Sequence, residues 1–357
     1  MPKVRLSGTV TGANDPGRGA RARILYLLFA GGWDIYNSNG DQRISLANIQ
    51  KKIIESDAFV FTPGATLEDM FKAISIFVGY QTLDRHLSGK PTVLLNSDRS
   101  WDPLLEVLAH LRVMGTIRQD YRDYLLSADT AEGVVALLDG VRGEGLPDPG
   151  RERFAATTTE SFETEIPAGY LGNACVFCSA SLEEESYLAD GEALGRQLAE
   201  NRIGCVSGAG RSGIMGAVVR GSVGAGGWTA GSNVPHIIEL EGLPDGLSSF
   251  WLRPDIYTRM EVMIRNSDAF VIFPGGAGTV QELLALMIFQ QQNSSLMTGK
   301  PVVIFNRTDE EGHGFWDPMI ALLSAMTSPG SFVVAQTFDE LLPAVKAGLR
   351  SAAPAAA

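Results

Sequence analysis

The stretch FPGGAGTVQE, residues 273–282, joins a short apolar run to a helix-forming run and decides the fold. The apolar residues that lead into it, AFVIF, predict a buried strand, and those after it predict a helix. Gly275, Gly276 and Gly278 allow positive φ and a close approach of backbone N–H groups to a ligand. Thr279 can cap the helix, whose N-terminus carries about half a positive charge. A tight turn without a ligand is the simpler alternative, but this composition favours a phosphate-binding turn.

Apolar runs and amphipathic stretches alternate on both sides of this turn. Strands are predicted at 174–178, 203–206, 229–233, 269–273 and 301–305, and helices near 187–200, 213–222, 256–266 and 279–292. Such alternation is typical of βαβ units, in which helices cover both faces of a parallel sheet. The predicted fold is therefore a doubly wound, Rossmann-like α/β sandwich.

The same pattern occurs twice in the chain. SDAFVFTPG at 56–64 matches SDAFVIFPG at 267–275 in seven of nine positions, and GKPTVLLN at 89–96 matches GKPVVIFN at 299–306 in five of eight. The tripeptide WDP follows each copy in the same order. Because order and spacing are kept, we infer an internal duplication, with the α/β sandwich present twice.

The boundaries follow from composition. We expect the first α/β domain over 1–142 and the second over 171–350. Residues 143–170 are rich in Gly, Pro, Thr and Glu without a sustained period, which is typical of an interdomain connection. Residues 351–357 are expected to form a frayed tail.

The first copy retains packing residues but lacks the residues of a site. Its turn, PGATLED at 63–69, is interpreted as two residues shorter than the second turn, with two glycines missing. Aligned on Ser-Asp-Ala, Asn48 stands in place of Arg259, and aligned on the threonine, Asp69 stands in place of Glu282. We therefore assign the functional site to the second domain and regard the first as degenerate.

Composition limits the functional classes. The chain has 357 residues, 45% hydrophobic and 20% charged, with a net charge of -12 and a pI of about 4.9. This balance argues against binding of nucleic acid or of an anionic membrane, which needs clustered Lys and Arg. No apolar run approaches the ~20 residues that span a bilayer, and no signal peptide is evident. We expect a cytoplasmic protein.

The three cysteines form neither a disulfide framework nor a metal set. Cys175 and Cys178 lie inside the apolar run ACVFC, and Cys205 lies in another apolar run. A CxxC motif can bind zinc or act in redox chemistry, but no second CxxC or HxxxH completes a set. We interpret all three as buried strand residues of a protein in a reducing compartment.

A second glycine-rich segment, GAGRSGIMG at 208–216, contains GxGxxG. A dinucleotide site is rejected, because the next strand ends in GSNV without the acidic residue that binds an NAD ribose. The segment is better explained as a loop that faces the 274–279 turn across a crevice at the carboxyl edge of the sheet. Its candidate binding residues are Gly208, Gly210, Arg211, Gly213 and Met215.

Two charged residues complete the predicted site. Glu282 follows Thr279 by three residues, so its carboxylate can reach the crevice, although it could instead form a capping box with Thr279. Arg259 precedes the 269–273 strand on a helix that leads to the same edge, although it could be a solvated surface residue. These residues indicate a nucleotide or sugar phosphate and do not name a reaction.

The combined motifs are similar to those of the Lonely Guy family of nucleotide phosphoribohydrolases, long labelled lysine decarboxylases. The family's PGGxGTxxE is intact from Pro274 to Glu282, and its GGGxxGLMG appears at 208–216 with Ala209 and Ile214 as departures. The resemblance covers about 171–350 well and 1–142 only in degenerate form.

Two further family motifs are present in altered form. The opening CVxCGSS appears as CVFCSAS, with Ser179 in place of the glycine. The RK pair appears as Arg259 and Met260, so the lysine is lost. The change at Met260 weakens any inference that the base is a cytokinin.

The resemblance implies hydrolysis of the N-glycosidic bond of a purine nucleoside 5′-monophosphate, AMP or N6-substituted AMP, without a cofactor or metal. It makes Glu282 and Arg259 the catalytic pair. The glycines of the 275–279 turn, Thr279 and Ser179 would bind phosphate or ribose, and the 208–216 loop would close the crevice. The alternative is a protein of the same fold that binds a nucleotide or molybdenum cofactor without turnover.

Family members pair with their sites near the pairing surface, so a fused, degenerate copy implies an intramolecular pseudo-dimer, with further homo-oligomerisation expected. Lysine decarboxylation is argued against directly. Pyridoxal chemistry needs a lysine for the Schiff base, and no lysine occurs between 91 and 299.

Overall fold

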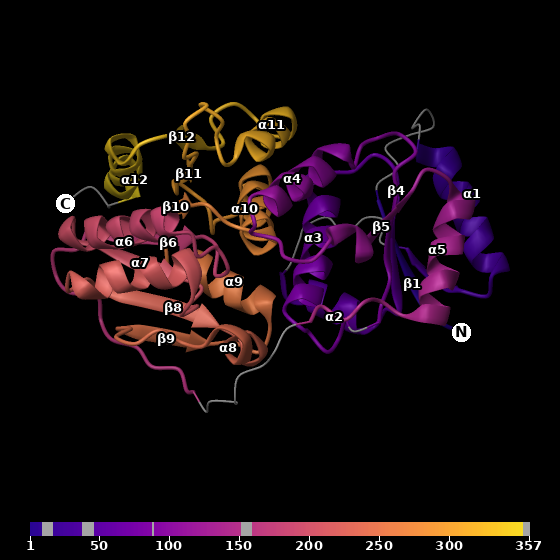
Figure 1. Ribbon diagram of the computed structural model, residues 1–357, viewed down its shortest axis with the longest axis horizontal. Coiled ribbons are helices and arrows are strands. Elements are labelled where there is room, and N and C mark those ends of the chain that lie inside the picture. Colours follow the sequence, from indigo (N-terminus) through magenta and orange to yellow (C-terminus); the bar gives the residue numbers. More distant parts are fainter. Residues whose placement is uncertain (9–16, 38–45, 88, 151–158, 353–357) are drawn as a thin grey trace. The chain divides into compact units, whose positions relative to one another are not determined.

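The computed structural model describes residues 1–8, 17–37, 46–87, 89–150 and 159–352. The chain divides into two compact units (Figure 1). Unit 1 comprises Met1–Val113 and Ile117–Arg151, and unit 2 comprises Met114–Thr116 and Glu152–Ala357. Each unit is built around its own parallel sheet.

Unit 1 holds a five-stranded parallel sheet in the order β2-β1-β3-β4-β5. Helices α1 and α5 cover one face and α3 lies on the other (Figure 1). The elements are β1 (Lys3–Ser7), α1 (Gly17–Ala30), β2 (Asp34–Asn37), α2 (Leu46–Ile54), β3 (Ala58–Phe61), α3 (Leu67–Gln81), β4 (Thr92–Leu95), α4 (Asp102–Val113), the 3-10 turn η1 (Tyr121–Asp123), β5 (Leu125–Ala128) and α5 (Ala131–Glu144).

Unit 2 holds a seven-stranded parallel sheet in the order β12-β11-β10-β6-β7-β8-β9. Its elements are β6 (Gly172–Phe177), α6 (Glu185–Glu200), β7 (Ile203–Ser207), α7 (Gly213–Gly224), β8 (Thr229–Asn233), α8 (Pro235–Glu241), β9 (Ser249–Leu252), α9 (Ile256–Arg265), β10 (Ala269–Ile272), α10 (Ala277–Gln291), β11 (Val302–Phe305), α11 (Asp317–Met326), β12 (Val333–Ala335) and α12 (Phe338–Ala352). The predicted Rossmann-like α/β class is confirmed for both units.

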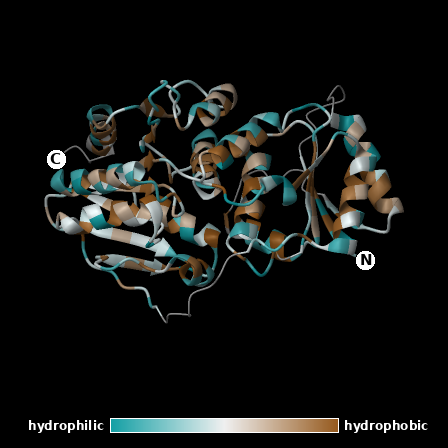
Figure 2. Ribbon diagram, viewed as in Figure 1, coloured by the Kyte–Doolittle hydropathy of each residue, from teal (hydrophilic) through white to brown (hydrophobic). Residues whose placement is uncertain are grey.

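The five predicted strands of the second copy are present, and β9 and β12 are additional. Both are short, and β12 lies at the sheet edge with two exposed valines, so neither carries the long apolar run that marks a central strand. Strand β8 was predicted although its sequence is TAGSN. Its residues are all buried, yet it is pale rather than brown in Figure 2.

Strand order places a switch point at the same position in each unit. In unit 2 the chain runs outward from β6 to β9 and returns to pair β10 with β6, with Ile272 opposite Phe177. In unit 1 it runs from β1 to β2 and returns to pair β3 with β1. Ligands of such sheets bind where the strand order reverses, outside the carboxyl ends. The turns that follow β10 and β3 lie at these positions.

The start of α10 corrects one prediction. The helix begins at Ala277 with Gly276 as its N-cap, so Thr279 lies within the first turn and is not the capping residue. Glu282 consequently lies in the second turn of the helix. The glycine is at the cap because Gly275 and Gly276 carry the chain from strand to helix without side chains.

The alignment of α3 with α10, the helices that follow the two switch-point turns, corrects a second prediction. Helices α3 and α10 both have 15 residues, and each is followed by a left-handed residue, Leu83 and Asn293. The N-cap Thr66 therefore corresponds to Gly276. The turn between β3 and α3 is one residue longer than the turn between β10 and α10, whereas the sequence had indicated that it is two residues shorter. In this register Asp69 corresponds to Thr279, and Lys72 stands in place of Glu282.

The expected connection and tail fall partly outside the described residues. Helix α5 continues to Glu144, residues 151–158 are not described, and Phe162 forms an antiparallel bridge with Phe250 on β9. Helix α12 extends to Ala352, and residues 353–357 are not described. Within the described part of the chain, no helix is long and apolar enough to cross a membrane.

Candidate functional site

The turn after β10 is attached to the end of β6. The backbone N–H of Ser179 donates to the carbonyl of Pro274 at 3.0 Å. A Cβ on Gly275 would lie 2.1 Å from Oγ1 of Thr279, so only glycine lets the Thr279 side chain fold over the turn. The N-cap of α10, Gly276, has no side chain that could cap the helix, and a Cβ on it would lie 2.8 Å from the carbonyl oxygen of Thr116. The partial positive charge of this helix end is therefore not neutralised by an N-cap side chain.

The loop from Gly208 to Ser212 is held against the same strand end. The backbone N–H of Met215 donates to the carbonyl of Ser179 at 3.0 Å, and the N–H of Gly210 points at the sulfur of Met215 at 3.0 Å. Gly213, at the start of α7, has φ of +60° and packs against the backbone of Ala180. The structure therefore brings the two predicted glycine-rich segments together through the turn after β6.

Arg259 is fixed at this sheet edge by backbone carbonyls. Its Nε donates to the carbonyl of Ser232 at 2.9 Å, and its Nη2 donates to the carbonyl of Gly208 at 3.0 Å. These carbonyls lie at the ends of β8 and just past β7, so two strands orient one guanidinium. Asp255 caps α9 through the N–H groups of Tyr257 and Thr258. A solvated surface arginine, the alternative interpretation, is excluded.

Glu282 is buried in unit 2 with 6% of its surface exposed. Burial raises the pKa of its carboxyl to about 8, Arg259 opposes the rise, and Glu241 adds to it. A capping box is excluded, because Thr279 is not the N-cap. The charge of Arg259 therefore acts on the Glu282 carboxyl within unit 2.

Glu241 was missed by the sequence analysis. It is the last residue of α8, and its Oε2 lies so close to Gly210 that a Cβ there would be 2.9 Å away. It therefore adds a second carboxylate beside the glycine-rich loop. No spacing motif links Glu241 to the loop, so only the fold shows their proximity.

The other predicted site residues differ in what they do. The Ser179 hydroxyl accepts hydrogen bonds from the N–H groups of Ser181 and Leu182, both at 3.0 Å, so it organises the turn after β6. Arg211 is exposed, and its stem lies along Gly242. Met260, at the position of the lost lysine, is 2% exposed and belongs to the core.

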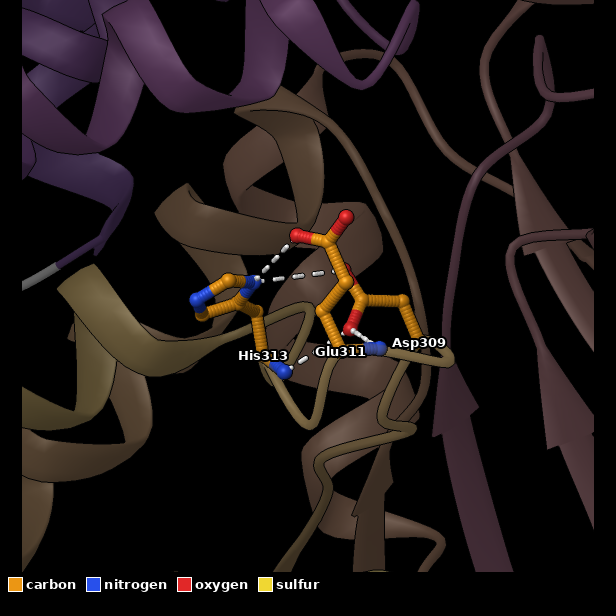
Figure 3. Close-up of side chains that lie close together, drawn as sticks. All are labelled: Asp309, Glu311 and His313. Atoms are coloured by element: carbon orange, nitrogen blue, oxygen red, sulfur yellow. Dashed lines mark hydrogen bonds and ion pairs between the residues drawn. The ribbon is translucent and has the colours of Figure 1, made fainter.

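The cysteines are free and buried, as their apolar context predicted. Burial raises the pKa of the Cys175 and Cys178 thiols well above the ordinary value, which leaves them protonated and poor metal ligands. Among the described residues, Asp309, Glu311 and His313 bring possible ligand atoms within 4.8 Å of one another (Figure 3). All three are exposed, and exposed acidic groups commonly lie close together without an ion, so this cluster alone does not define a metal site.

Lys300 has a structural role. Its Nζ donates to the carbonyl of Ile264 in the last turn of α9 at 3.1 Å, where a cation stabilises the helix end. Lys90 does the same at the end of α2, at 3.0 Å from the carbonyl of Ile53. The repeated Gly-Lys-Pro therefore conserves a helix cap, which agrees with the argument against Schiff-base chemistry.

Each unit is a doubly wound α/β domain with a turn at its switch point, so the chain holds two copies of one fold. The chain belongs to the family described as "Possible lysine decarboxylase", the Lonely Guy family, whose model matches residues 41–138 and 215–345. Together the two segments cover more than half of the chain, and one lies in each half. The second segment includes Arg259 and the 273–282 stretch.

Among curated proteins, the chain is similar to a probable cytokinin riboside 5′-monophosphate phosphoribohydrolase of Oryza sativa subsp. japonica, LOGL5. The two are 32% identical over 157 residues, 44% of this chain and 61% of that one. A cytokinin riboside 5′-monophosphate phosphoribohydrolase of Arabidopsis thaliana, LOG5, is 32% identical over 143 residues, 40% of this chain and 61% of that one. The chain thus spans about three fifths of the length of these relatives.

Among solved structures, a molybdenum cofactor binding protein from Rippkaea orientalis matches 49% of this chain and 96% of its own, at 18% identity and a TM-score of 0.39. A protein titled TM1055 matches 48% of this chain and 96% of its own, at 25% identity and a TM-score of 0.37. These likenesses carry no argument about the ligand.

Proposed function

We propose that unit 2 hydrolyses the N-glycosidic bond of a purine nucleoside 5′-monophosphate, AMP or N6-substituted AMP, to the free base and ribose 5-phosphate. The observation that carries this proposal is a buried carboxyl, Glu282, on the helix that follows the switch-point turn, together with the Arg259 guanidinium that two strand ends orient at the same sheet edge. The names of the curated relatives supply the reaction class.

The uncapped N-terminus of α10 suits the 5′-phosphate. The N–H groups around Gly276 and Gly278 lie at the positive end of the helix, where a dianion is stabilised by short charge-assisted hydrogen bonds. This contact would hold the nucleotide by a group that does not react. The ribose would then extend from the turn toward the second turn of the helix, which carries Glu282.

The two charged side chains would act on the ribose and base. Glycosidic cleavage passes through an oxocarbenium-like state, and an ionised Glu282 can stabilise its positive charge and position the attacking water. Arg259 keeps N–H donors beyond the two used by the backbone, so it can hold the phosphate or polarise the departing base. Because the carbonyls of Ser232 and Gly208 fix the guanidinium before the ligand binds, little reorganisation is needed on binding.

The pH dependence separates two roles for Glu282. With a pKa of about 8, the carboxyl is mostly protonated at neutral pH in the free protein. If the carboxylate is the active form, kcat/KM should rise with pH and level off above about 8. A profile that instead falls through this range would assign a general-acid role and contradict the mechanism given above.

The direct test is chromatography of AMP, GMP, IMP, CMP and N6-substituted AMP after incubation with the full chain. We expect base and ribose 5-phosphate from AMP or its N6-substituted form, and loss of both products in Glu282→Ala and Arg259→Ala. Arg265→Ala is the matched control, because Arg265 lies on the helix of Arg259, is exposed and pairs with Glu261. If every nucleotide is recovered unchanged, the proposal is wrong and binding without turnover replaces it.

We also propose that residues 1–142 serve as the permanent partner of 171–350 in an intramolecular pseudo-dimer. The repeated fold and the lysine at the Glu282 position of unit 1 support this division of roles. Sedimentation and turnover of residues 165–357 expressed alone test it, because a folded, monomeric and fully active fragment would contradict it. Three free, buried cysteines support a reducing, cytoplasmic location.

A further inference from the structure

The turn after β3 in unit 1 has its own acidic ligand. The backbone N–H of Gly64 donates to Oδ2 of Asp98 at 2.8 Å, and the N–H groups of Gly64 and Ala65 donate to the Ser100 hydroxyl, both at 3.0 Å. Ser100 in turn donates to Oδ1 of Asp98 from its hydroxyl at 2.8 Å and from its backbone at 3.1 Å. Two side-chain oxygens, Oδ2 of Asp98 and Oγ of Ser100, thus accept from the N–H groups of the turn.

The remaining polar groups of this turn are used within unit 1. Thr66 and Asp69 form a capping box, in which the N–H of Asp69 donates to Oγ1 of Thr66 and the N–H of Thr66 donates to Asp69. On the β1 side, buried Arg21 donates to the carbonyl of Gly8 at 2.8 Å and to Thr62 at 3.3 Å. Among the residues that the structure describes at this edge, Asp69 and Arg21 are therefore engaged within unit 1.

Unit 2 differs in the loop that supplies Asp98. Both loops start from the same frame, in which an asparagine at the end of the strand accepts from the tryptophan N–H and donates to the following aspartate. The loop between Asn306 and Trp316 is five residues longer than that between Asn96 and Trp101. It is held against α6, because Arg307 pairs with Asp190 at 3.2 Å.

We propose that Asp98, with Ser100, is a built-in substitute for a ligand phosphate, so that unit 1 binds no nucleotide and the chain has one nucleotide site. A carboxylate that accepts from backbone N–H groups of the turn before a helix makes contacts that a phosphate oxygen would make. Because Asp98 is tethered within unit 1, in the loop after β4, it acts at a high effective concentration, and free phosphate must compete with it. The exclusion of phosphate from unit 1 is independent of the reaction proposed for unit 2, whereas the number of nucleotide sites rests on that proposed function.

The test is amide NMR of the full chain during titration with inorganic phosphate. In the unaltered protein we expect the Gly64 and Ala65 resonances to stay fixed. In the double variant Asp98→Ala/Ser100→Ala we expect them to shift and saturate at millimolar phosphate. Asp309→Ala removes an exposed aspartate from the corresponding loop of unit 2 and is the matched control, expected to leave both resonances fixed.

Two outcomes would overturn the proposal. Saturable shifts of Gly64 and Ala65 in the unaltered protein would show that Asp98 does not exclude phosphate. Fixed resonances in a folded double variant would show that the cleared turn is no anion site and that Asp98 only braces its loop. Asp98→Asn, which keeps the shape and removes the charge, is expected to give weaker shifts and replaces the double variant if that fails to fold. The resonances of Gly275 and Gly276 report on unit 2 separately.

Discussion

The turns after β3 and β10 occupy equivalent switch points of two similar sheets and differ in what their polar groups contact. Around α3, Thr66, Asp69, Asp98 and Ser100 satisfy N–H groups from within unit 1. At α10 the N-cap is a glycine, and no described side chain caps the helix. The comparison teaches that this fold needs the helix N-terminus to be stabilised, but not by a particular source. Unit 1 supplies acceptor oxygens from its own side chains, whereas the N-cap of α10 in unit 2 has no side chain to do so.

What the duplication preserved is structural. Lys90 and Lys300 each cap a helix end, and Trp101 and Trp316 each donate a backbone N–H to the asparagine that ends the neighbouring strand. These contacts fix the sheet edge without touching the turn N–H groups. A residue that is repeated in both units is therefore explained by folding. Glu282 and Arg259 are not repeated in unit 1, and neither contributes to the contacts that the two units share.

The largest expected effect is a loss of turnover on substitution of Glu282, whose position on α10 corresponds to Lys72 on α3. Glu282→Gln keeps the size of the side chain and removes its charge, so turnover of AMP should fall roughly 10²- to 10⁴-fold. Lys72→Gln at the corresponding position of α3 should leave turnover within about twofold, because Lys72 only pairs with Glu68 on its own helix. The measurement is kcat/KM for each variant, with circular dichroism to show that both fold. Equal losses in the two variants would remove the functional distinction between the units.

Glu282 should also make the stability of the protein depend on pH. The folded pKa of Glu282 lies above its unfolded value, so between about pH 4.5 and 8 the native state retains a proton that the unfolded state has lost. Stability must then fall as pH rises through this window, by up to roughly 1.4 kcal/mol per pH unit. Glu282→Gln should flatten this decline in urea unfolding curves measured at pH 5, 6, 7 and 8. An unchanged slope would show that Glu282 does not carry the shifted pKa.

Sequence periodicity sufficed for the fold class because strands such as AFVI are apolar throughout, and a buried parallel strand requires little else. The duplication was detectable because packing residues repeat in the same order, with only short differences in spacing. Register was harder. Thr66 and Thr279 look equivalent in sequence, yet one is an N-cap and the other lies inside a helix, because the two turns use different numbers of residues before the helix begins.

The pairing of Arg259 with the strand ends could not be read from the sequence. Its partners are the carbonyls of Gly208 and Ser232, and a backbone carbonyl has no residue type to recognise. Glu241 and Asp98 were missed for a related reason. Each meets a glycine backbone far along the chain, so no motif spacing records the contact.

Alanine substitution of the first glycine in each turn should be more damaging in unit 2. At Gly275 a Cβ would lie 2.1 Å from Oγ1 and 2.5 Å from Cβ of Thr279, and such overpacking costs about 1–3 kcal/mol. At Gly64 there is open space, but its φ of +79° costs an alanine about 1 kcal/mol. Urea unfolding of Gly275→Ala and Gly64→Ala compares them. A larger loss of unfolding free energy in Gly64→Ala than in Gly275→Ala would mean that the turn of unit 2 tolerates a side chain better than the turn of unit 1.

The smallest expected effect tests the cap itself. Thr66→Val keeps the shape of the side chain and removes the Oγ1 that accepts from the N–H of Asp69, so unit 1 should lose about 1 kcal/mol. Thr279→Val removes a hydroxyl that caps nothing, so its effect on unfolding should stay within about 0.5 kcal/mol, and any loss should appear in KM for AMP. The first variant should leave KM unchanged, because its contacts lie within unit 1. A loss of stability from Thr279→Val as large as that from Thr66→Val would mean that both helices rely on threonine for folding, and the distinction between an internally capped turn and a ligand-binding turn would fail.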